Sequence, residues 1–197
     1  MPNPEPDLRT QTLTIAKRMF IERGYHGLAM REIAEAVGAS KAALYYHFKD
    51  KEELFLAVIL PYLDELEAAL DRIAAEPVST AERIRKFVGY VLGQLAEERA
   101  IIRLASQEMG QLSTASRQAF DSSYQEKFIG KLRSLVKAGI TAGEFRAVDP
   151  GITTWALLGM MYPYFYPAHT GNKPLPETTI EAVTSIFLNG ILQHPGA

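Results

Sequence analysis

Apolar and polar positions follow helical spacing along most of this 197-residue chain. Between Leu13 and Phe20, for example, apolar side chains recur at intervals of three and four residues, and the pattern stops at Gly24, a common residue just past a helix. Patterns that would indicate strands are nearly absent. The sequence therefore predicts an all-α fold of about nine helices.

Start and stop signals give the expected bounds of these helices. Ser40, Asp50 and Ser79 are cap residues that precede apolar runs, and Asp149 is followed by a proline at the first helical position. Pro61 lies inside the fourth helix and predicts a kink there. The expected helices run from about 7 to 23, 29 to 37, 40 to 47, 50 to 75, 79 to 98, 99 to 109, 113 to 141, 150 to 166 and 177 to 193.

Composition narrows the class of protein. An apolar fraction of 47% is enough to form a core, and no run of eighteen apolar residues predicts a membrane span. The first residues lack the basic-then-apolar order of a secretory signal, and residues 1–6 are expected to be a disordered lead. With no cysteine the chain has no disulfide and no thiolate site, which favours a cytoplasmic location.

Charge is distributed unevenly along the chain. The net formal charge is −2, but residues 9 to 51 carry eight cationic and four acidic side chains. The amino-terminal segment is therefore basic and the remainder is acidic. This distribution is compatible with a polyanion-binding head on a non-binding body, although solvated surfaces alone often give such an imbalance.

The second and third expected helices are separated by a turn of about three residues, which is typical of a helix-turn-helix. Such a turn needs a small residue where the helices approach, a glycine at the turn and an aliphatic residue in the second helix. Ala34, Gly38 and Leu44 meet these needs at the right spacing. The spacing alone is common, so it supports the motif without proving it.

The stretch from Met30 to Phe55, "MREIAEAVGASKAALYYHFKDKEELF", closely resembles the signature of the tetracycline-repressor (TetR/AcrR) family of transcriptional regulators. The resemblance implies a helix-turn-helix DNA-binding domain over residues 7–52. It also implies a ligand-binding and dimerisation domain over residues 53–197, with homodimers formed through the last two helices. The family commonly has Thr or Ser just before the second helix, whereas this chain has Leu28-Ala29, and Gly27 must supply the turn there.

A helix-turn-helix places the start of its second helix in the major groove, and this geometry identifies candidate DNA contacts. The residues expected to face base edges are Lys41, Ala42, Ala43 and Tyr45. Those expected beside the phosphates are Ser40, Tyr45, Tyr46, His47 and Lys51. Arg31 matches a family position that can reach a base.

A second group of side chains suggests a hydrophobic effector. Aromatic and methionine side chains on the fifth to seventh helices lie where the family builds its pocket, and Arg103 could meet an acidic headgroup. The cluster around Trp155 in the eighth helix suits either a dimer core or a pocket. The candidate effector residues are Phe87, Tyr90, Arg103, Met109, Phe120, Tyr124, Phe128 and Trp155. The candidate dimer residues are Trp155, Leu158, Tyr162, Ile180, Val183, Ile186, Phe187 and Ile191.

No catalytic motif, cofactor-binding motif or metal-ligand spacing is present, and the four histidines are isolated in the sequence. The sequence therefore predicts a homodimeric, ligand-responsive repressor that binds an inverted-repeat operator in double-stranded DNA and is released by a hydrophobic small molecule. An alternative is an effector-free DNA-binding protein whose helical body serves only dimerisation or partner binding. A helical enzyme is a third possibility, which lacks a visible acid–base pair.

Overall fold

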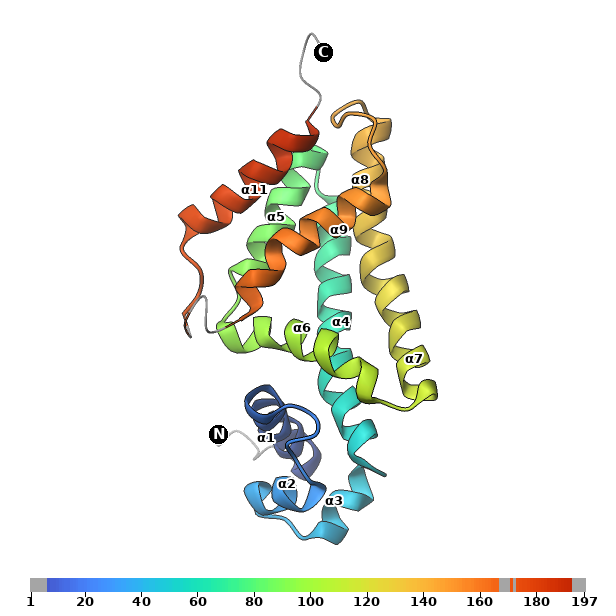
Figure 1. Ribbon diagram of the computed structural model, residues 1–197, viewed down its shortest axis with the longest axis vertical. Coiled ribbons are helices and arrows are strands. Elements are labelled where there is room, and N and C mark those ends of the chain that lie inside the picture. Colours follow the sequence, from blue (N-terminus) through green and yellow to red (C-terminus); the bar gives the residue numbers. More distant parts are fainter. Residues whose placement is uncertain (1–6, 167–170, 172, 193–197) are drawn as a thin grey trace, which may run out of the picture. The chain divides into compact units, whose positions relative to one another are not determined.

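The computed structural model describes residues 7–166, 171 and 173–192, and in these ranges the chain is helical without a named strand (Figure 1). An isolated antiparallel bridge pairs Phe145 with Leu192. The predicted all-α fold is thus confirmed. The lead that was expected to be disordered, residues 1–6, lies outside the described residues.

Three short helices at the amino-terminal end pack against one another. The first begins where the Asp7 carboxylate accepts a hydrogen bond of 2.7 Å from the Thr10 backbone N–H. It ends at Gly24, whose φ of 70° favours glycine. These helices are α1 (Leu8–Arg23), α2 (Met30–Val37) and α3 (Lys41–His47).

A longer helix, α4 (Lys51–Ala75), follows directly. The Asp50 carboxylate accepts a hydrogen bond of 2.9 Å from the backbone N–H of Glu53, and the Glu53 carboxylate accepts one of 2.8 Å from that of Lys49. These two bonds fix the first turn of α4. The helix continues through Pro61 without ending, and the kink expected there stays a prediction.

The rest of the chain folds into further helices, of which α5 packs against α8 and α11, and α8 packs against α9. Their bounds are α5 (Thr80–Leu92), α6 (Ala96–Glu108), the 3₁₀ turn η1 (Met109–Gln111), α7 (Thr114–Tyr124), the π-helical segment η2 (Gln125–Ile129), α8 (Gly130–Thr141), α9 (Pro150–Met161), the 3₁₀ turn η3 (Tyr162–Phe165) and α11 (Glu177–Ile191).

The predicted fifth helix was too long. It ends at Leu92 instead of near residue 98, because a buried guanidinium holds the chain in a turn there. Arg99 is only 1% exposed, and its Nη1 donates to the carbonyl oxygens of Leu92 and Gln94. These bonds satisfy carbonyl groups that a continuing helix would have used.

Two other predicted helices are interrupted. The helix expected over residues 113–141 contains the π-helical segment η2, where the backbone takes one wider turn. The helix expected over residues 150–166 changes to a 3₁₀ turn after Met161. Pro163 contributes to that change, because it has no N–H with which to continue the α-helical bonding.

The chain divides into two compact units. One contains residues up to Tyr62 together with Leu104–Asp121, and the other contains Leu63–Arg103 with residues from Ser122 onward. In the first unit, the ring of Phe55 lies 5.1 Å from those of both Phe20 and Tyr25, centroid to centroid. This aromatic cluster joins the start of α4 to α1 and the loop after it.

No helix in the described ranges combines the length and the apolar character that a bilayer crossing requires.

Candidate nucleic-acid interface and effector site

The turn between α2 and α3 is built by a glycine and two backbone hydrogen bonds. Gly38 has a φ of 76°, in the left-handed region. Its N–H donates to the Glu35 carbonyl at 3.1 Å, and the N–H of Ala39 donates to the Ala34 carbonyl at 2.9 Å. This is the Schellman arrangement at a helix end, and it lets α3 start only a few residues after α2 ends.

Helix α3 has one buried face and one exposed face. Leu44 and Phe48 are buried and hold the helix on the first unit. Ser40 caps its start by accepting a hydrogen bond of 3.1 Å from the Ala43 N–H. On the other side Lys41, Ala42, Tyr45 and Tyr46 are exposed, whereas Ala43 and His47 are half-buried.

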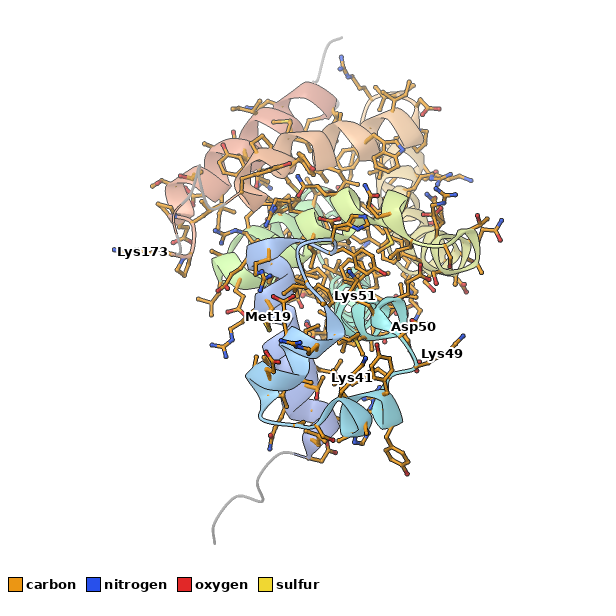
Figure 2. The ribbon with its side chains drawn as sticks, turned by 60° about the horizontal axis from the view of Figure 1, so that its bottom comes forward. Met19, Lys41, Lys49, Asp50, Lys51 and Lys173 are labelled. Atoms are coloured by element: carbon orange, nitrogen blue, oxygen red, sulfur yellow. The ribbon has the colours of Figure 1, made fainter. Side chains whose placement is uncertain are left out.

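Contacts within α3 orient its exposed donors. The ammonium of Lys41 lies 5.5 Å from the centroid of the Tyr45 ring, a cation–π arrangement. Lys41 is labelled in Figure 2. The rings of Tyr46 and His47 meet edge to face at 5.2 Å. Tyr46 is 86% exposed, so its side chain is open to solvent. The exposed face therefore presents an ammonium and two phenols, which can donate hydrogen bonds to bases or phosphates.

Helix α2 begins without a side-chain cap, as its sequence predicted. Ala29 has no acceptor, and Glu32 compensates by accepting a hydrogen bond of 2.8 Å from the Ala29 N–H. The other carboxylate oxygen of Glu32 pairs with Arg23 at 2.7 Å, and this bond is the main reason why the pKa of Glu32 lies below its usual value. A Cβ at Gly27 would collide with the Arg23 carbonyl, so the turn requires glycine there.

Arg31 lies on the exposed side of α2. Its Nε donates to the Glu35 carboxylate at 2.9 Å, and both side chains are more than half exposed. The pair is one turn apart and open to solvent, so it is weak enough to exchange for a nucleic-acid contact.

Lys51, predicted beside phosphate, is already engaged inside the first unit. Its ammonium donates to the carbonyl oxygens of Tyr25 at 2.7 Å and Leu28 at 2.9 Å. Burial lowers the pKa of this ammonium, and the charge of Glu108 opposes that shift. Two of the three N–H donors therefore hold the loop between α1 and α2, and the phosphate contact stays a prediction.

Part of the predicted effector group is brought together in the second unit. The ring of Phe128 lies 6.0 Å from that of Phe87 and 5.5 Å from that of Tyr124, between centroids. Tyr90, on the same helix as Phe87, is half-buried. Phe128 belongs to the π-helical segment, and such segments are frequent at functional sites.

The remaining predicted effector residues are placed differently. Arg103 lies over the Tyr166 ring at 5.6 Å in the second unit. Met109 and Phe120 are buried in the first unit. Trp155 is 53% exposed on α9, which suits an interface better than a pocket.

Exposed apolar side chains gather on α9 and α11, which pack together. Ile152 and Trp155 lie one turn apart on α9 and are more than half exposed. Ile186 on α11 is 66% exposed, whereas its predicted interface neighbours Val183, Phe187 and Ile191 are buried within the chain. The exposed apolar surface on α9 and α11 is therefore smaller than the predicted dimer surface. It consists of Ile152, Trp155 and Ile186.

Several hydrogen bonds between residues far apart in the sequence were not predicted. The Glu144 carboxylate accepts hydrogen bonds from the Thr80 N–H at 2.7 Å and the Ala81 N–H at 3.2 Å, so it caps α5 from a distant loop. Lys131 on α8 donates to the Asp71 carboxylate of α4 at 2.6 Å, which is the main reason why the pKa of Lys131 is raised. No sequence spacing links these partners, which are about 60 residues apart.

Within the part of the chain that the structure describes, no three His, Asp or Glu side chains gather in a way that could hold a metal ion.

Comparison with known proteins agrees with this geometry. A family model described as bacterial regulatory proteins of the tetR family matches residues 13–58, and a model described as a tetracyclin repressor-like C-terminal domain matches residues 77–164. The uncharacterized HTH-type transcriptional regulator YfiR of Bacillus subtilis is 30% identical over 146 residues, which are 72% of this chain and 70% of that protein.

Two further matches carry functional names. The HTH-type transcriptional activator FasR of Mycolicibacterium smegmatis is 38% identical over 85 residues, which are 43% of this chain and 39% of that protein. A crystal structure of AibR in complex with isovaleryl coenzyme A and operator DNA has a TM-score of 0.75 and 25% identity, covering 94% of this chain and 98% of that one.

Proposed function

Because this chain belongs to the tetR family of bacterial regulatory proteins, we propose that it is a repressor that binds an inverted-repeat operator as a homodimer and leaves it when a hydrophobic small molecule binds. The family identifies a DNA-binding regulator of transcription and not an enzyme. We assign DNA binding to residues 7–52, and effector binding and dimerisation to residues 53–197.

The exposed face of α3 is the observation that carries this proposal. Leu44 and Phe48 fix the helix, so Lys41, Tyr45 and Tyr46 are presented together on a short helix that follows a tight turn. In a helix-turn-helix the start of this helix meets base edges, and its flanks meet phosphates. Lys41 on this face and Arg31 on the exposed side of α2 are the long donors that we propose reach guanine.

Selection from random duplex DNA tests the operator. One short recognition helix reads too few base pairs for specificity, so two copies must bind together. We expect an inverted repeat with half-sites about one helical turn apart, or a multiple of this distance. Recovery of asymmetric sites alone would refute the two-fold arrangement.

The effector is proposed to be an acyl compound with a polar head, such as an acyl coenzyme A. Two observations support this class. The rings of Phe87, Tyr124 and Phe128 form an apolar cluster in the second unit, and AibR, a structural relative, was crystallised with isovaleryl coenzyme A. Native mass spectrometry of the purified protein, alone and with short- and long-chain acyl coenzymes A, tests it. If no bound compound is found and none alters operator binding, the effector-free alternative is favoured.

Activation of transcription is the second candidate, because FasR is named an activator. A promoter–reporter fusion carrying the selected operator distinguishes the two. Expression of the protein should lower the reporter signal if the chain is a repressor. A rise in the signal would reverse the assignment and leave the DNA-binding part of the proposal intact.

A further inference from the structure

One carboxylate on α4 receives three hydrogen bonds from the start of α7. Glu52 Oε1 accepts from the Ser113 backbone N–H at 2.6 Å. Its Oε2 accepts from the hydroxyls of Ser113 at 2.8 Å and Ser116 at 2.7 Å. All three residues belong to the first compact unit, and the two serines lie 61 and 64 positions after Glu52 in the sequence.

These bonds satisfy donors that a helix start leaves open. Ser113 precedes α7, and its backbone N–H has no partner inside that helix. The negative carboxylate at this end of α7 also interacts favourably with the positive end of the helix dipole. The pKa of Glu52 is lowered chiefly by the bonds from Ser116 and Ser113, so the carboxylate is charged at neutral pH.

Lys51, the residue before Glu52, forms hydrogen bonds within the DNA-binding head, the helix-turn-helix of residues 7–52. Lys51 donates to the Tyr25 and Leu28 carbonyls just before α2, whereas Glu52 holds the start of α7. The first turn of α4 therefore holds the head with one side chain and α7 with the next. A further bond of 3.0 Å joins His26, in the loop after α1, to Gln111 in η1, just before α7.

Helix α7 connects the residues that bond Glu52 with the predicted effector residues along the chain. It ends at Tyr124, which contacts Phe128 of the π-helical segment. A shift of α7 along or about its axis would move Ser113 and Ser116, and with them the three bonds to Glu52. Helix α7 thus carries the partners of Glu52 at its start and a residue of the predicted effector group at its end.

We propose that Glu52 is a positioning residue for operator binding, which fixes the DNA-binding head to α7 and transmits movement of α7 to it. The effector part of this inference rests on the proposed function, but the positioning part does not. An operator fixes the separation of two recognition helices, so a head that is not held to α7 must be ordered when DNA binds. That ordering weakens binding.

The first test compares Glu52→Gln with Glu65→Gln, a control that removes the same charge from an exposed site on the same helix. The glutamine amide has one acceptor oxygen, so it cannot accept from the Ser113 backbone N–H on one side and from the two serine hydroxyls on the other. We expect Glu52→Gln to bind the operator about tenfold more weakly, which is the loss of roughly one charged hydrogen bond. Glu52→Gln and Glu65→Gln should bind non-operator DNA with the same affinity and the same salt dependence. Equal operator affinity in the two variants would overturn the inference.

The second test removes the partners. The double variant Ser113→Ala with Ser116→Ala should weaken operator binding as Glu52→Gln does, and adding Glu52→Gln to it should cause little further loss. Ser116→Thr keeps a hydroxyl and should behave like the native protein. Additive losses would mean that Glu52 acts independently of α7. The double serine variant also tests the inference if Glu52→Gln does not fold.

The third test uses isovaleryl coenzyme A as the probe. If it releases the native protein from the operator, Glu52→Gln should bind it with the same affinity but show a smaller ratio of operator affinities without and with probe. An unchanged ratio would overturn the transmitting role. If the native protein does not bind the probe, that effector is wrong, and the first two tests still decide the positioning role.

Discussion

The ammonium of Lys51 lies 2.7 Å from the carbonyl oxygen of Tyr25 and 4.1 Å from the centroid of the same residue's ring. A second donor reaches the Leu28 carbonyl at 2.9 Å. One side chain at the start of α4 thus closes the loop that leads into α2. The same ammonium is a candidate phosphate contact, and the two roles have different experimental consequences.

Lys51→Met should destabilise the protein more than it changes the electrostatics of DNA binding. The two carbonyls lose a charged donor, so we expect the free energy of unfolding to fall by about 1 kcal/mol or more in urea titrations. Lys49→Met, at an exposed site nearby, is the control. A phosphate contact would reduce the slope of log affinity against log salt by about 0.9. If Lys51→Met shows this smaller slope and no loss of stability, the phosphate role of Lys51 is favoured.

Lys41→Ala should relax sequence discrimination at one operator position. Its ammonium is exposed at the start of α3, where a donor can reach the acceptors of guanine. We expect a loss of about 1–3 kcal/mol against the preferred base and little change for the others. Competition binding with singly substituted operators measures this. Tyr46→Phe provides the contrast, because loss of a phosphate donor should weaken all these duplexes alike; identical profiles for both variants would contradict this division of roles.

Ile186→Asp should convert the proposed homodimer to monomers. Ile186 is 66% exposed on α11, beside the helix that carries Ile152 and Trp155. Burying a carboxylate in an apolar interface is unfavourable, so association should be lost at micromolar concentration in sedimentation experiments. Leu95→Asp changes a comparably exposed leucine between α5 and α6 and should leave the dimer intact. A dimeric Ile186→Asp protein would place the interface elsewhere.

Tyr124→Phe should make stability less sensitive to alkaline pH. Burial raises the pKa of Tyr124 from 10.0 to about 12. The phenol therefore stays protonated in the folded protein while it ionises in the unfolded chain. Its contribution is complete below pH 10 and is lost as the pH rises through 12. Between about pH 9 and about pH 11 the native protein should lose roughly 1 kcal/mol more than the variant in urea titrations. Equal losses would mean that this phenol is not protected.

The helix-turn-helix could be predicted from the sequence because its determinants are local. Gly38 supplies the left-handed turn, Ser40 caps the next helix, and Leu44 holds it at a spacing that a reader of the sequence can count. The exposed face of α3 follows from the same periodicity. Short-range capping and helical spacing act within a few residues, so these features were visible before the fold was known.

Tertiary structure alone decided the features that join distant parts of the chain. Arg99 ends α5 by reaching carbonyls in a turn, Lys51 turns inward to the loop after α1, and Glu52 caps a helix about 60 residues away. Each of these residues resembles an ordinary exposed charge in the sequence. Their partners are chosen by packing between helices, which brings together donors and acceptors that no local pattern relates. The sequence by itself therefore determined the helix-turn-helix and the exposed face of α3, whereas the fold determined how that face is held.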